Sequence, residues 1–253
     1  MLADYIIEPI LLKETKRMNT PLLLDQLTVF ELSGKDATTF LENQIISNLP
    51  ENKDGIYTAI CNPKGRIQYS LFIFKKDEGF FVAVNDDLSD NFFHYVSLRK
   101  FRMNFSINKS NQRLVTQSEQ TPNNAILPLQ VMKPDDSLQS ASNDQFWQFI
   151  FKIELPWITK KTAELFIPQH VNLDQKNIIA FDKGCYPGQE IIARLHYLGT
   201  VKKRMQLVTV DKFNSHISGE SVYIPEFNEK VDICSPAIKN KLSWQFQAIC
   251  PVK

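Results

Sequence analysis

Three closely spaced β-rich runs constrain the fold of this chain most. Residues 57–61, 67–74 and 80–84 are rich in aromatic and β-branched side chains, which favour extended strands. Residues 62–65, Asn-Pro-Lys-Gly, have the composition of a type I turn closed by glycine, and residues 75–79 turn the chain again. Connections this short join antiparallel neighbours, because parallel strands need a long crossover. The sequence therefore predicts three consecutive antiparallel strands.

The segments around these runs predict the rest of an α+β half. Residues 27–32 alternate like a strand, and a helix over 35–47 follows. A second helix is expected to begin at Asp86 or Ser89. One face of this helix carries Phe92, Tyr95, Val96 and Arg99. The order strand, helix, strands, helix indicates a ferredoxin-like half.

Polar residues then replace apolar ones between 108 and 145, so most of this region is predicted to be loop. A short strand is expected within 125–131. Order resumes with a strand over 146–153 and a short helix over 162–166, which Pro168 ends. After residue 201, alternation predicts four short strands, at 206–210, 220–224, 230–234 and 244–250.

Residues 182–190 combine a thiol, two glycines and a helix start. Pro187 and Gly188 suit the central positions of a type II turn. A helix is predicted over 189–198, with Gly199 just past its end. Its apolar stripe consists of Ile191, Ile192, Leu195 and Leu198. Cys185 is therefore expected near a helix N-terminus.

Two interpretations of Cys185 follow from this setting. The partial positive charge of the helix end, with Lys183 two residues away, favours thiolate over thiol, which is the setting of a reactive cysteine. Alternatively, Cys185 is a small buried hydrophobe, as many free cysteines are. Cys61, Cys234 and Cys250 lie within or beside apolar runs and are expected in the core.

The segment 183–190, Lys-Gly-Cys-Tyr-Pro-Gly-Gln-Glu, resembles the K-G-C-[FY]-x-G-Q-E signature of the YgfZ family. These are folate-binding proteins related to the glycine-cleavage T-protein. The resemblance continues through 193–194 to the basic residues 202–204, and back through 166–169 and 172–174. It implies a protein that binds tetrahydrofolate or a related reduced folate and helps to assemble or repair iron–sulfur clusters. Its partners would be iron–sulfur proteins or their assembly factors, among them radical enzymes that modify tRNA.

The resemblance also implies a domain organisation. Residues 1–200 would form a T-protein-like folate-binding α+β domain of ferredoxin-like antiparallel sheet halves. The N-terminal half would cover about 1–107, the polar loop region 108–145 and the second half 146–200. Residues 201–253 would form a small, shortened β-barrel.

The resemblance places a functional thiol, Cys185, at the mouth of a folate cleft. The residues implied in folate binding are Lys183, Gly184, Tyr186, Gly188, Gln189, Glu190, Arg194, Asn172, Asp174 and Glu154. Two positions depart from the family pattern. Asn43 stands where glycine is usual, and Asn48 where an acid is common.

Several of these residues also have ordinary interpretations. Lys183, Gln189 and Glu190 fit a solvated turn and a first helical turn with a favourable acid. Arg194 is a surface charge or an anchor for an anionic ligand. The basic residues 202–204 form a solvated turn or attract the polyglutamate tail of a cellular folate.

Two rival functions stay open. One is a folate-dependent aminomethyltransferase or other one-carbon transferase, as the T-protein is. In that relative a pair of acids follows the hairpin turn, whereas this chain has Tyr69 and Ser70 there, and neither supplies a carboxylate. This favours a helper protein over a classical enzyme. The other rival is a scaffold that kept the fold and lost the ligand.

The net charge and the spacing of the cysteines limit the other kinds of function that this chain could have. The formal net charge of +1 leaves no broad basic face, so no direct nucleic-acid binding is expected. The four cysteines have no C-x-x-C spacing, and no zinc pattern is present, so no metal site is predicted. Residues 1–8 lack an export signal and no run suggests a membrane span. A cytoplasmic protein with reduced thiols is expected; the sequence gives no oligomeric state.

Overall fold

The structure is a computed structural model that describes residues 20–51, 53–117, 127–211, 218–224 and 228–252. Residues 1–8, on which the expectation about export rests, lie outside these ranges. In the part described, no helix is long and apolar enough to cross a membrane.

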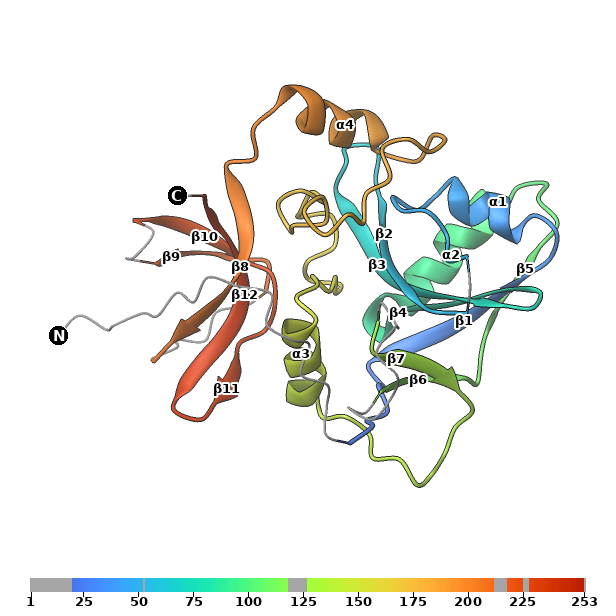
Figure 1. Cartoon of the computed structure of the whole chain (residues 1–253), viewed down its shortest axis with the longest axis horizontal. Coiled ribbons are helices and arrows are strands. Elements are labelled where there is room, and N and C mark those ends of the chain that lie inside the picture. Colours follow the sequence, from blue (N-terminus) through green and yellow to red (C-terminus); the bar gives the residue numbers. More distant parts are fainter. Residues whose placement is uncertain (1–19, 52, 118–126, 212–217, 225–227, 253) are drawn as a thin grey trace.

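The N-terminal half is built on one antiparallel sheet with the strand order β2-β3-β4-β1-β5 (Figure 1). Its strands are β1 (Leu27–Ser33), β2 (Ile56–Cys61), β3 (Ile67–Lys76), β4 (Gly79–Asn85) and β5 (Ser106–Lys109). The three consecutive strands predicted from the sequence are confirmed as β2, β3 and β4. Helices follow β1 and β4, so the element order is that of the predicted ferredoxin-like half with β2 as an additional edge strand.

The sheet is covered on both faces, as the side chains that alternate between the two faces of β3 show. Phe72 stacks on Trp157, with ring centroids 4.7 Å apart. Tyr69 points to the opposite face, where it makes edge contacts with Phe92 and Tyr95 of helix α2 (Ser89–Arg99). Because β3 is buried on both faces, it reads as a nearly continuous apolar run.

The first helix is shorter than predicted. Helix α1 covers Ala37–Glu42, whereas the sequence suggested 35–47. The chain leaves the helix because the residues after it pair with β2: Ile45 bridges Ile60, and the amide of Ile46 donates to the carbonyl of Ala59 at 3.0 Å. The second helix is confirmed as α2, preceded by a single 3-10 turn, Asp86–Leu88.

The second half corrects three predictions. Residues 146–153 were expected to form a strand, but helix α3 covers Asn143–Lys152. The cause is a capping box in which Ser142 accepts from the amide of Gln145 while the Gln145 side chain accepts from the amide of Ser142. Residues 146–200 contain no strand, so no second ferredoxin-like sheet half forms, and 162–166 forms turns rather than a helix.

The polar region also holds more order than predicted. Strand β5 overlaps the start of the region 108–145. Within the region, β6 (Arg113–Thr116) pairs with β7 (Leu129–Met132) in a two-stranded sheet. The strand expected within 125–131 is therefore present but shifted, and part of its predicted range lies outside the described residues.

The C-terminal segment forms a second antiparallel sheet from β8 (Lys203–Val210), β9 (Ser221–Ile224), β10 (Glu229–Ile233), β11 (Ile238–Asn240) and β12 (Ser243–Pro251). The four predicted strands are confirmed, and β11 is an addition. β12 pairs with β8, β10 and β11, while β9 pairs with β10. No pairing among the described strands closes this sheet, so the predicted barrel is not confirmed.

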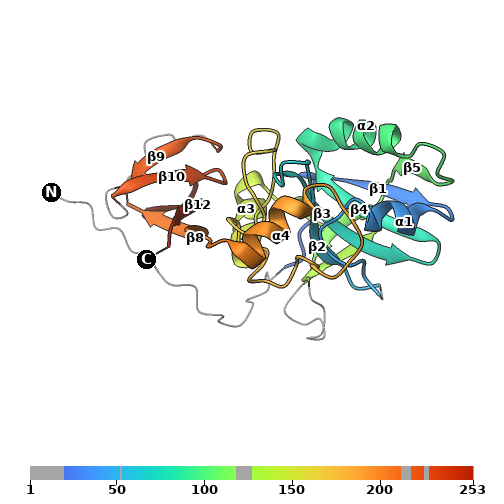
Figure 2. The same cartoon turned by 90° about the horizontal axis from the view of Figure 1, so that it is seen from above.

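Helix α3 lies between the two sheets in both views (Figures 1 and 2). Its apolar side chains, among them Phe146, Trp147 and Ile150, belong to the large hydrophobic core that also contains both faces of the N-terminal sheet. Met205 of β8 and Ile249 of β12 reach the same core, while the other side of the C-terminal sheet has a small core of its own.

Candidate functional site

The loop that carries Cys185 packs directly on the β2–β3 hairpin turn. Gly188 adopts φ 80° and ψ 0°, the conformation predicted for the second central position of a type II turn. A Cβ atom on Gly188 would lie 2.5 Å from the carbonyl oxygen of Asn62 and 2.7 Å from the Cα of Gly65. Only glycine fits this contact. Helix α4 (Gln189–Leu198) begins right after it, as predicted.

Two side chains anchor the same loop on either side of Cys185. Tyr186 is buried at 6% exposure and belongs to the large core. Lys183 is half-buried, and its Nζ donates to the carbonyls of Ser47 at 2.6 Å and Ile45 at 3.1 Å. The Lys183 ammonium is thus directed to backbone carbonyls rather than to the thiol, which departs from the role that the sequence suggested for it.

Cys185 itself is exposed, whereas the other three cysteines are buried. Burial raises the pKa of Cys61 and Cys234 above the ordinary range, and raises the pKa of Cys250 to about 12. A side chain added at the neighbouring Gly184 would meet nothing within 4 Å, so the space beside the thiol is open. The interpretation of Cys185 as a buried hydrophobe is therefore wrong.

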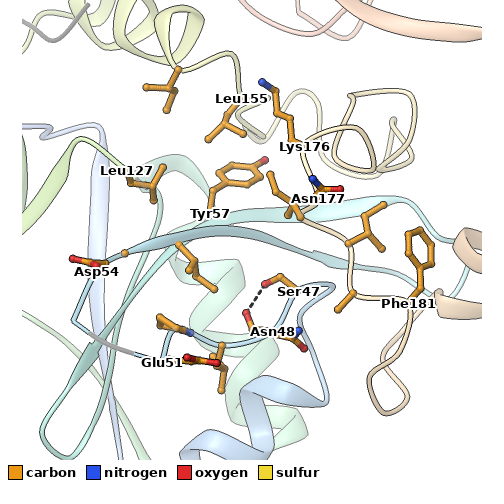
Figure 3. Close-up of a pocket in the computed structure, with 18 of the residues that line it drawn as sticks. Ser47, Asn48, Glu51, Asp54, Tyr57, Leu127, Leu155, Lys176, Asn177 and Phe181 are labelled. Carbon is orange, nitrogen blue, oxygen red and sulfur yellow. Dashed lines mark hydrogen bonds between the residues drawn. The ribbon is translucent and has the colours of Figure 1, made fainter. Parts of the chain in front are cut away.

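A cavity of about 980 Å³ lies next to this loop (Figure 3). Its walls come from the segment after α1, the start of β2, the end of α3, the turn before the Cys185 loop and the last turn of α4. The lining residues are 47–51, 54–57, Leu127, Pro128, Ile153, Leu155, 176–182 and Tyr197.

The cavity is mainly apolar with a few polar groups at its edge. Tyr57 and Leu155 lie close together in its lining, with Lys176 and Asn177 beside them (Figure 3). Phe181 and Tyr197 form an aromatic pair, with ring centroids 6.0 Å apart. An apolar space of this size with a few polar groups suits a flat heteroaromatic ligand.

None of the ten residues implied in folate binding lines this cavity. Asp174 instead makes a two-point ion pair with Arg204, at 2.5 and 2.9 Å. The amide nitrogen of the Asn172 side chain donates to the carbonyl of Met205 at 2.8 Å. These contacts tie the second half to β8. Because Arg204 is already paired, it is unsuited to attract a folate tail.

Glu154 lies one contact away from the large cavity. It pairs with Lys176, whose Nζ is 3.1 Å from its carboxylate, and Lys176 belongs to the wall of the large cavity. Glu154, Lys176 and Asn172 also line a separate cavity of about 420 Å³ beside β8.

The motif residues lie alongside the cavity rather than in it. The side chain of Gln189 donates to the carbonyl of Lys183 at 3.3 Å, inside the loop, while Glu190 and Arg194 are exposed on α4. The Cys185 loop meets the cavity wall through Ser47, which accepts from Lys183, and through Asp182, which lines the wall itself.

The wall includes two positions that the sequence singled out, Asn48 and Asp182 of the 182–190 segment, and several that it did not. Asn48, which stands where the family commonly has an acid, lines the cavity. Tyr57, Lys176, Phe181 and Tyr197 were not singled out. They come from segments far apart in the chain, so no local pattern groups them, although Phe181 directly precedes the motif segment.

The positions of the T-protein acid pair are structural here. The hydroxyl of Ser70 is fully buried and accepts from the amide of Ile158 at 2.8 Å. Tyr69 packs among aromatic rings under α2. Among the described residues, no group of three or more His, Cys, Asp or Glu side chains is placed to hold a metal ion.

We expect Cys185 to be alkylated first when native protein is treated with iodoacetamide, because it is exposed while burial disfavours the thiolate of the other three. Cys185→Ser should change the free energy of unfolding by no more than about 0.5 kcal/mol, as exposed substitutions do. Timed labelling with peptide mass mapping and a urea melt measure both. First labelling at Cys61, Cys234 or Cys250 would contradict the assignment.

Stability should also depend on pH through Lys183. Burial lowers the pKa of Lys183 to about 8 from its ordinary 10.5, although Glu42 acts in the opposite direction. Between these two pH values the unfolded chain binds the proton and the folded chain has released it, so the stability of the folded state rises with pH. The free energy of unfolding of the natural chain should therefore increase relative to Lys183→Met from pH 7.5 to 10. Urea melts of both proteins at each pH measure this difference; a constant or shrinking difference would contradict it.

Comparisons with known proteins agree with the resemblance seen in the motif. No protein-family model matches the chain. The tRNA-modifying protein YgfZ of Hamiltonella defensa is 25% identical over 261 residues, which cover 85% of this chain and 74% of that protein. YgfZ of Klebsiella pneumoniae is 25% identical over 260 residues, covering 85% and 76%.

One further sequence relative and one solved structure extend the comparison. The mitochondrial iron–sulfur cluster assembly factor IBA57 homolog of Pyricularia oryzae is 26% identical over 214 residues, which are 70% of this chain but 54% of the fungal protein. This chain thus spans about half of that relative. The crystal structure of the glycine cleavage system aminomethyltransferase T of Bartonella henselae superposes with a TM-score of 0.64 at 12% identity, over 94% of this chain and 80% of that one. The chain is therefore similar in sequence to the YgfZ proteins and has the fold of the aminomethyltransferase T-protein.

Proposed function

We propose that this chain binds tetrahydrofolate or a related reduced folate in the 980 Å³ cavity and acts, through Cys185, as a helper protein in iron–sulfur cluster assembly or repair. The observation that carries the proposal is the shared wall between cavity and thiol loop. Ser47 lines the cavity and accepts a hydrogen bond from Lys183, two residues before Cys185. A ligand site and an exposed thiol thus form one unit.

The comparisons support the cellular role. One set of relatives is named for tRNA modification and another relative for iron–sulfur cluster assembly. A helper of radical enzymes that modify tRNA would join both roles, since those enzymes carry iron–sulfur clusters. The partners would be such proteins or their assembly factors, in the cytoplasm, and contact with tRNA would be made by the client enzyme.

The cavity chemistry supports the ligand class. A folate offers a flat pterin ring, a second aromatic ring and an anionic tail. Phe181 and Tyr197 give the cavity aromatic surface, and Tyr57 and Leu155 give it apolar walls. Asn177 and Asp182 offer polar groups for the ring edge. The motif residues from Lys183 to Glu190 would hold Cys185 in place rather than contact the ligand.

Titration calorimetry with tetrahydrofolate under anaerobic conditions tests the site. Ala180 lines the cavity, so Ala180→Phe should weaken binding by about 5- to 150-fold, the factor that corresponds to the usual 1 to 3 kcal/mol cost of overpacking. Ala237→Phe is the matched control, because Ala237 has similar exposure and lines a different cavity. It should bind as the natural chain does. Absence of binding by the natural chain at millimolar folate would favour a scaffold without ligand.

The fold similarity to an aminomethyltransferase makes a one-carbon transferase the second candidate. Tyr69 and Ser70 stand where that chemistry would use carboxylates, and both are held in the core. We therefore expect no protein-dependent formation of methylene-tetrahydrofolate from an aminomethyl donor. The assay is the absorbance of a coupled dehydrogenase, with an authentic aminomethyltransferase as positive control. Turnover above background that is lost in Ala180→Phe would make the chain an enzyme.

A further inference from the structure

We propose that Lys183 is a positioning residue that couples the cavity to the thiol loop, residues 183–188, so that a ligand against the 47–48 wall restrains the backbone around Cys185. The inference rests on the proposed function for the identity of the ligand. It goes beyond that function because it assigns a physical link between the two halves of the site.

The first end of the link is the segment 45–48. Ile45 bridges Ile60 on β2, and the Ser47 hydroxyl donates to the hydroxyl of Thr58 at 2.8 Å in a fully buried contact. Ser47 and Asn48 form part of the cavity wall (Figure 3). A ligand that packs on these two residues therefore presses on the segment whose carbonyls accept from Lys183.

The second end is the thiol loop. Gly188 is fixed on the hairpin turn, and Tyr186 is buried in the core. Gly184 and Cys185 lie between these anchors and Lys183, and both are exposed. Without Lys183, the stretch before Tyr186 would lose its two hydrogen bonds to the 45–48 segment, one of them to Ser47 of the cavity wall. Lys183 thus decides how firmly the backbone at Cys185 is held.

The two hydrogen bonds from Lys183 can pass a movement of the 45–48 segment on to the thiol loop. An ammonium that is half-buried must keep its acceptors, because a charged group that loses them away from water is costly. The two carbonyls lie two residues apart in one segment, and the 2.6 Å distance to Ser47 is short, as charge-assisted bonds are. A shift of the 45–48 segment must therefore move Lys183 or break these bonds.

The chain offers a matched control lysine. Lys75 of β3 also donates from its Nζ to a backbone carbonyl of the cavity wall, that of Glu51, at 3.1 Å. Lys75 belongs to the sheet and not to the thiol loop. Lys75→Met therefore removes a similar lysine-to-wall hydrogen bond without touching the proposed link.

Hydrogen–deuterium exchange of the full chain, with and without saturating tetrahydrofolate, tests the coupling. Without ligand, Lys183→Met should exchange about tenfold faster at residues 183–188, as expected when hydrogen bonds to a charged donor are lost, and Lys75→Met should not. With ligand, exchange in this loop should slow in the natural chain and in Lys75→Met but not in Lys183→Met. Folate concentrations are set from the affinity measured for each variant.

Each outcome decides a separate point. If ligand slows the loop equally in Lys183→Met, the signal passes through Asp182 and the inference is overturned while the proposed function stands. If folate binds the natural chain and leaves the loop unchanged, the inference is also overturned. If no variant binds folate, both fall. Should Lys183→Met not fold, Lys183→Gln, whose shorter side chain withdraws the donor from both carbonyls, gives the same comparison.

Discussion

The contact between Gly188 and the β2–β3 hairpin turn organises the functional part of this molecule. Backbone meets backbone there, since a Cβ atom on Gly188 would lie 2.5 Å from the Asn62 carbonyl oxygen. This contact fixes the start of α4 against the hairpin turn. The helix itself contributes little to the packing there, since Ile192 is its one buried residue. The thiol loop takes its position from that contact. The cavity wall includes Phe181 and Asp182, just before this loop, and Tyr197 in the last turn of α4.

The cavity exists because α1 ends early. If the helix continued to residue 47, as the sequence suggested, the carbonyls of Ile45 and Ser47 would be directed along the helix axis. Instead the chain pairs with β2 through Ile45, and the two carbonyls are free to accept from Lys183. Tertiary pairing overrides local helix propensity here. Because residues 45–48 pair with β2 instead of continuing the helix, Ser47 and Asn48 line the cavity and the carbonyls of Ile45 and Ser47 bind Lys183 of the thiol loop.

The sequence predicted what local chemistry dictates and missed what distant contacts decide. The turn at 62–65, the glycine at 188 and the bounds of α4 follow from residues that suit one backbone conformation, and the structure has all three. The run at 146–153 is mostly apolar, which suits a buried strand, but its two polar residues, Gln148 and Lys152, are spaced as on one face of a helix. This spacing and the capping box at Ser142 both favour the helix. The cavity joins Tyr57 to Tyr197, which no local pattern connects.

The position of Cys185 outside the cavity wall separates two kinds of mechanism. A nucleophile that reacts with a bound ligand must reach it at about 3 to 3.5 Å, and the described lining of the cavity includes Asp182 but not Cys185. The exposed thiol faces open space beside Gly184, where another macromolecule can approach it. Under the proposed coupling, a ligand in the cavity would act on the loop rather than on the sulfur. In the proposed function this arrangement suits a protein that presents its thiol to a partner, and it does not suit an attack by Cys185 on a ligand in the cavity.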